Sequence, residues 1–123
     1  MIKISLDEAY VFDLLSILDL KRIKSLGKED NQKHNENYNT LYSEISEQIT
    51  DIKMDEIIKS EEYKNLVNIN TKVFDLVDLG KEQEGLARTT AMANYDRFIL
   101  KNKLQKKFFK NPLKEVKIGY DKV

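Results

Sequence analysis

The stretch AYVFDLLSILDL, residues 9–20, decides the fold, because it is apolar almost throughout and is interrupted only by Asp13, Ser16 and Asp19. A helix that is apolar on all sides is buried on all sides. In a chain of 123 residues, this stretch therefore predicts a central helix or a subunit interface. We take as candidate interface residues Tyr10, Val11, Leu14 and Leu18.

Both ends of this helix carry signals of their own. Ser5 and Glu8 have the Ser-x-x-Glu spacing of a capping box, in which each side chain binds a free amide at the start of the helix. Gly27 fits a position just after the helix, because glycine readily adopts the left-handed backbone found there. The sequence therefore predicts a helix over about residues 5–26.

Three further helices are predicted after it. The second has a narrow apolar stripe at helical spacing, made of Tyr38, Leu41, Tyr42, Ile45, Ile49 and Ile52. A break is predicted within residues 51–60, with Ser60 as the cap of a third helix that stops at Gly80. The fourth helix is predicted over residues 86–110 and ends before Pro112.

A short repeat bears on how these helices are arranged. Val-Phe-Asp-Leu occurs at residues 11–14 and again at 73–76, and each copy is followed by Gly-Lys-Glu and then by Asn-Tyr. Glycine and proline, which punctuate β-rich folds, are scarce. We therefore predict a single all-α domain over residues 1–123, a four-helix up-and-down bundle with short connections, which two similar helical hairpins could compose.

The two ends of the chain have a different pattern. Residues 2–4 and 116–120 alternate between apolar and polar side chains. A period of two is typical of strands, so the ends could pair as a short two-stranded ribbon. Frayed tails explain the ends equally well, and the pattern leaves both interpretations open.

Composition excludes several kinds of activity. The chain has no cysteine, which rules out disulfides, thiol catalysis and cysteine-ligated metals. Residues 1–5 lack the apolar run of a signal peptide, and no stretch has the roughly 18 apolar residues that a membrane span needs. We therefore expect a cytoplasmic protein without a membrane partner, and the richness in lysine, asparagine and isoleucine fits a bacterial or phage source.

Few residues could carry catalysis. His34 is the only histidine and lies among polar residues, and the glycines are isolated rather than grouped into a phosphate-binding loop. Two carboxylate pairs remain, Glu44-x-x-Glu47 and Asp75-x-x-Asp78. They resemble the motif of the all-α nucleotide pyrophosphatases, Glu-x-x-Glu followed on the next helix by Glu-x-x-Asp, although Asp75 stands where that family has glutamate. The resemblance covers these four residues and implies a Mg²⁺-dependent enzyme. The helical wheel instead turns the acids toward solvent, so we expect no enzyme, no metal and no cofactor.

Polar residues lie on the predicted inner face of the fourth helix. Asn94, Asn102 and Gln105 share this face with Tyr95 and Phe98. One interpretation is a peripheral helix with a partly wet face. The other is a buried amide network, with Asn70 as a natural partner, that fixes register or oligomeric state.

The charges are distributed unevenly. The net charge is zero, but residues 97–122 have a net charge of +7 and residues 1–96 a net charge of −7. The candidate basic patch consists of Arg97, Lys101, Lys103, Lys106, Lys107 and Lys110. Together with neighbouring aromatic residues, it could follow a nucleic-acid backbone. Alternatively, the lysine stems cover apolar surface and their ammonium groups face the acidic helices of the same chain or of a sister subunit.

These observations predict a small non-enzymatic helical protein that acts through an interaction surface. Its partner is expected to be a second copy of the chain, giving a dimer, or another protein. A nucleic-acid-binding accessory protein is the first alternative, and a Mg²⁺-dependent enzyme similar to the all-α nucleotide pyrophosphatases is the second.

Overall fold

The computed structural model describes residues 2 and 4–111 and shows an all-helical protein. Its helices are α1 (Glu8–Lys24), α2 (Asn31–Ile49), α3 (Asp51–Ile58), α4 (Glu61–Gly80) and α5 (Ala87–Phe108). No strand occurs in this part of the chain, which confirms the all-α class. The predicted ribbon depends on residues 3 and 116–120, which lie outside the described residues.

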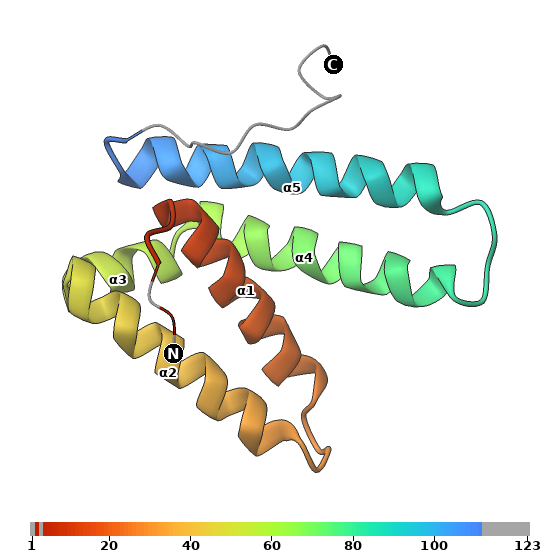
Figure 1. The fold of residues 1–123 in the computed structure, drawn as a ribbon, viewed down its shortest axis with the longest axis horizontal. Helices are drawn as coiled ribbons and strands as arrows, with labels where there is room; N and C mark the ends of the chain where they lie inside the picture. The colour runs from red at the N-terminus through yellow and green to blue at the C-terminus, as the bar shows by residue number, and fades with distance from the viewer. Residues whose placement is uncertain (1, 3, 112–123) are drawn as a thin grey trace.

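The helices form two hairpins that cross each other (Figure 1). The first consists of α1 and α2, the second of α4 and α5, and the short α3 joins them. α1 is the central helix, which was one of its two predicted placements, because it packs against α2, α4 and α5. The four-helix up-and-down arrangement is not confirmed, since the described residues contain five helices and α1 runs obliquely across the second hairpin (Figure 1).

The additional helix, α3, lies where the sequence predicted a break. Thr50 ends α2 with a φ of 83°, and its hydroxyl oxygen accepts a hydrogen bond from the Lys53 amide at the start of α3. Met54 and Ile57 of α3 are fully buried in the core, so the burial of apolar surface stabilises this turn. The prediction that the apolar stripe of α2 reaches Ile52 is wrong, because this side chain is 85% exposed.

The core lies where α1 crosses the other helices. Phe12 is buried at its centre, with its ring edge-on to Tyr63 at 6.5 Å and tilted against Phe109 at 6.1 Å between ring centroids. All five helices contribute buried apolar side chains, which are Ala9, Phe12, Leu15, Tyr38, Ile45, Met54, Ile57, Tyr63, Leu66, Ile69, Ala93 and Leu104. One contiguous cluster therefore holds both hairpins together.

The predicted boundaries of α4 are confirmed. The Ser60 hydroxyl accepts a hydrogen bond from the Tyr63 amide at 3.1 Å and caps the helix. Two glutamates occupy the first turn, where negative charge is favourable, and Gly80 is the last helical residue. The cap, the glutamates and the glycine all lie within or next to the helix in the sequence, so the boundaries could be predicted without knowledge of the fold.

The start of α1 differs from the predicted capping box. The helix starts at Glu8 with Asp7 rather than Ser5 in the N-cap position, and the Ala9 amide donates a hydrogen bond to the side-chain oxygen of Gln105 at 2.9 Å. The amide nitrogen of Gln105 donates to the Glu8 carboxylate at 2.8 Å. A fully buried residue of α5 therefore caps α1 from the far end of the chain.

Candidate functional site

A buried polar cluster lies at the crossing of the two hairpins and is centred on Asp13. This carboxylate is only 3% exposed. Arg97 of α5 binds it with two nitrogens, Nη2 to Oδ2 at 2.6 Å and Nε to Oδ1 at 3.0 Å. Such a two-point pair fixes both the distance and the relative orientation of α1 and α5.

Two further side chains complete the cluster around Asp13. Asn70 of α4 donates its amide hydrogens to Asp13 Oδ1 at 2.8 Å and to Ser16 Oγ at 2.6 Å. Lys101 is buried, and its Nζ lies 4.0 Å from Asp13 Oδ2 and 5.2 Å from the centroid of the Tyr10 ring. Both oxygens of Asp13 are thus engaged by the chain itself. The arrangement suits a specific joint between hairpins better than it suits acid–base catalysis.

A second cluster joins α1, α2 and α4. Asp19 accepts hydrogen bonds from Arg22 Nε at 2.7 Å and from the Tyr63 hydroxyl at 3.2 Å. The Arg22 guanidinium lies 3.9 Å above the Tyr38 ring. An open pocket of about 240 Å³ adjoins these residues.

Both tyrosines of this second cluster are poor candidates for nucleophiles. Burial and the nearby Asp19 carboxylate raise the pKa of Tyr63 far above its ordinary value near 10. Burial, and again Asp19, also raises the pKa of Tyr38. Both hydroxyl groups therefore stay protonated at neutral pH.

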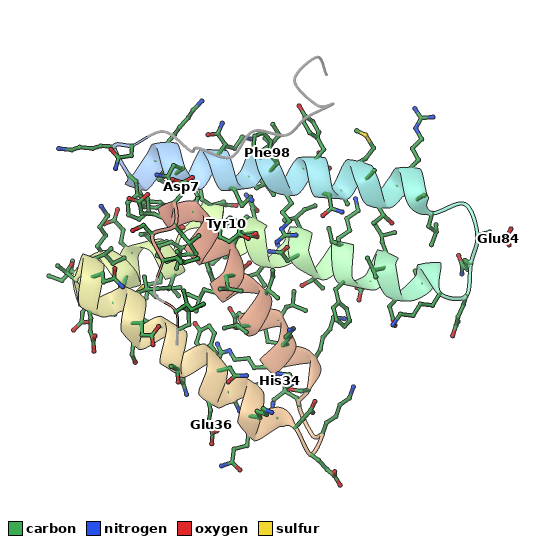
Figure 2. All side chains as sticks on the ribbon, viewed as in Figure 1. Asp7, Tyr10, His34, Glu36, Glu84 and Phe98 are labelled. Carbon is green, nitrogen blue, oxygen red and sulfur yellow. The ribbon has the colours of Figure 1, made fainter. Side chains whose placement is uncertain are left out.

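The four candidate interface residues divide into two pairs. Tyr10 and Leu14 are 46% and 41% exposed, and Figure 2 shows Tyr10 where α1 passes the second hairpin. Val11 and Leu18 are partly buried and pack against the core. One turn of α1 therefore leaves Tyr10 and Leu14 exposed, and the other two residues stabilise the chain's own fold.

The candidate basic patch divides as well. Arg97 and Lys101 point inward to Asp13, and Lys107 donates to the Glu62 carboxylate at 2.5 Å. The remaining members are exposed, and two of them form a short outer stripe of α5, one turn apart, whereas the third follows the end of the helix. They are Lys103, Lys106 and Lys110. The surface expected for a nucleic-acid backbone is therefore half the size that the sequence predicted.

The buried amide network is only partly found. Asn70 and Gln105 are both buried, but Asn70 binds Asp13 and Ser16, whereas Gln105 caps α1. Asn94 donates to a backbone oxygen of its own helix. The predicted inner face of α5 is wrong by about one residue, a rotation of roughly 100° about the helix axis, because the buried residues are Ala93, Lys101, Leu104 and Gln105.

The two carboxylate pairs do not form a metal site. Among the described residues, no group of three or more histidine, cysteine, aspartate or glutamate side chains is placed to hold a metal ion. Asp75 instead binds Lys24 at 2.7 Å, and Asp78 lies 3.5 Å from Lys81. His34 binds Asp30 at 3.0 Å near the start of α2 (Figure 2). The resemblance to the pyrophosphatase motif therefore lacks the convergent geometry that Mg²⁺ binding requires.

Comparison with family models, with curated proteins and with solved structures found no match to this chain. Within the described part of the chain, no helix combines the length and the apolar character needed to cross a membrane. Any assignment of function therefore depends on the surfaces and clusters of this molecule.

Proposed function

We propose that this protein acts by binding another protein chain, and specifically a second copy of itself, rather than by catalysis. The supporting observation is apolar side chains that the chain's own fold leaves uncovered. Tyr10 and Leu14 on α1 are one set. Phe74, one turn before Val77 on α4, belongs to another, and both are close to half exposed. Exposed apolar side chains that lie together, rather than singly, commonly mark an interaction site.

The second set lies where the α4–α5 hairpin extends beyond the first hairpin. Figure 1 shows the connected ends of α4 and α5 projecting past α1 and α2, and Figure 2 shows Glu84 at their tip. Leu79 and Met92 are also exposed in this region. Two helices alone cannot cover both of their apolar faces, so this end of the hairpin needs a further layer to bury them.

Charge favours a second copy as the partner. The exposed lysines of α5 form a basic stripe, whereas α2 and α3 expose the acids Glu44, Glu47, Asp55 and Glu56. These groups lie on different helices of one chain. Two copies could therefore bring the basic stripe of one chain against the acidic helices of the other.

The proposal is tested by measuring molecular mass against protein concentration with light scattering. We expect a dimer whose dissociation constant rises when Leu14→Glu or Phe74→Glu places a charge in the uncovered surface. Asn37→Glu is the matched control, because it adds the same charge at an exposed position in the first half of α2, outside both uncovered sets. A wild-type chain that stays monomeric at high micromolar concentration contradicts the proposal.

The remaining lysine stripe supports one alternative, binding to nucleic acid. Lys103 and Lys106 lie one turn apart on α5, Lys110 follows the end of the helix, and all three are exposed. This alternative predicts retention on DNA or RNA that weakens as salt increases, and that is lost when Lys103 and Lys106 become glutamate. Unchanged elution at low salt excludes it.

A further inference from the structure

We propose that Thr50 is a hinge between α2 and α3, and that two copies of the chain exchange their first hairpins through it. In the exchanged dimer, α2 and α3 form one continuous helix. The α1–α2 hairpin of each chain then docks on the α4–α5 hairpin of the other chain. This inference rests on the self-association proposed above.

The backbone of Thr50 is the first observation. Its φ is 83° and its ψ is 151°, and it is the only residue other than glycine with a positive φ in the described part of the chain. This region of conformational space is essentially restricted to glycine, and a β-branched side chain makes it more strained. The closed form therefore stores strain at a single residue between two helices.

The hydrogen bonds around Thr50 show how little must change to straighten the chain. The Thr50 amide already donates to the Ser46 carbonyl, and the Met54 amide donates to the Thr50 carbonyl, both at 3.0 Å and both in the helical pattern. The Lys53 amide donates to the Thr50 hydroxyl at 3.3 Å, where a continuous helix would offer the Ile49 carbonyl. Residues 28–79 contain no glycine or proline, so nothing in their composition requires a break.

Ile52 provides an independent observation. It is almost fully exposed in the closed form, although it follows Ile45 and Ile49 at intervals of seven and three residues. In one continuous helix, this spacing places all three on the same face. Straightening thus extends the apolar stripe of α2 to a residue that the closed form leaves in water.

The contacts between the hairpins can form equally well between two chains. α1 holds the second hairpin through specific pairs, of which the Asp13–Arg97 ion pair and the Gln105 cap of α1 span more than 80 residues of sequence. α2 packs against α1 within the first hairpin, and its contacts with α3 are re-formed with the α3 of the other chain. The first hairpin can therefore move as a unit, and a second copy presents the same docking surface, as in exchange of identical elements between protomers.

The hinge is tested with a matched pair, Thr50→Gly and Thr50→Ala. Both substitutions remove the capping hydroxyl, so they differ only in the Cβ atom. Glycine accepts the positive φ of the closed form and weakens a continuous helix, whereas alanine does the reverse. We expect the dimer dissociation constant of Thr50→Gly to exceed that of Thr50→Ala by at least about tenfold. Equal constants overturn the hinge.

Exchange itself is tested by complementation between chains. Asp13→Arg alone places two arginines together, and Arg97→Asp alone places two aspartates together, so each variant is expected to lose its compact fold or its stability. In an exchanged heterodimer, the reversed pair forms at one junction and the native pair at the other. Refolding the two variants together should therefore restore a stable dimer. The single chain that carries both substitutions is the positive control, because it can form the reversed pair in either arrangement.

The two proposals fail in different ways. If mixing restores nothing while the wild-type dimer is weakened by Leu14→Glu, exchange is wrong and the apolar surface stands. If mixing restores a dimer that Leu14→Glu and Phe74→Glu leave unchanged, exchange is right and the proposed surface is wrong.

Discussion

Arg97→Met is expected to destabilise the fold strongly, because it leaves the Asp13 carboxylate buried without its main partner. Removing one member of a buried ion pair typically costs about 3–5 kcal/mol. Three facts lower the expectation here. Asn70 still donates to the carboxylate and Lys101 remains 4.0 Å away, and Arg97 is partly exposed, so solvent screens part of its contribution. We therefore expect a loss of about 2–3 kcal/mol in the free energy of unfolding.

The assay is urea denaturation followed by the circular dichroism of the helices, at a protein concentration below the dimer dissociation constant measured by light scattering. With a urea slope of about 1–3 kcal/mol/M for a domain of this size, the midpoint should fall by about 0.7–3 M. The slope itself should not change, because the same surface is exposed on unfolding. Arg88→Met is the matched control on the same helix, and it should change stability by less than about 0.5 kcal/mol because Arg88 is exposed.

The double variant Asp13→Asn, Arg97→Met separates loss of contacts from the isolated charge. Asparagine keeps an oxygen for the Asn70 amide but carries no charge to bury. We expect this double variant to be more stable than Arg97→Met alone and to lie within about 1 kcal/mol of the wild type. If the double variant loses as much unfolding free energy as the single variants Asp13→Asn and Arg97→Met lose together, the view that the buried charge dominates the effect is refuted.

Three other predictions concern single side chains. Gln105→Ala removes the cap of α1 and leaves the buried Ala9 amide without its partner, so the urea midpoint should fall by an amount equivalent to about 1–3 kcal/mol. Phe12→Ala should cost about 3–5 kcal/mol and Phe74→Ala less than about 1 kcal/mol, because the first ring is 1% exposed and the second 44%; similar losses in thermal melts would contradict the observed burial. The raised pKa of Tyr63 means that the folded chain holds this proton more tightly than the unfolded chain. Stability from this residue is therefore complete below about pH 10 and declines above it, and Tyr63→Phe should reduce the alkaline decline when unfolding is measured across that range.

Local signals predicted the parts of the fold that local chemistry controls. The Ser60 cap, the end of α4 at Gly80 and the central position of the helix around residues 9–20 all follow from short-range sequence patterns. α3 was missed because Thr50 stops α2 with a conformation that threonine rarely adopts. Burial of Met54 in the core supports that turn, and the partners that bury it come from distant parts of the chain.

The buried cluster was missed for a different reason. Asp13 and Arg97 are 84 residues apart, and the local sequence around either residue does not identify the other as its partner. A signal was nevertheless present, because a carboxylate inside an apolar helix must find a cation or strong donors to be buried. Arg97 and Lys101 lie one turn apart on α5. A search of that helix for cations that could pair with Asp13 would therefore have identified its buried face, which the stripe of amide side chains predicted wrongly.

The two copies of Val-Phe-Asp-Leu show what a local sequence does not specify, which is whether other helices cover its apolar face. Both copies lie in the first helix of a hairpin, yet their side chains differ in burial. In α1, Phe12 and Asp13 are buried, and Asp13 binds Arg97. In α4, Phe74 is exposed and Asp75 binds Lys24 at the surface. The tetrapeptide supplies the same apolar face each time, and burial depends on whether another layer covers it. For the first copy that layer comes from the chain's own helices. For the second copy it is incomplete, which is why Phe74 is the residue whose substitution most directly tests whether a partner supplies the rest.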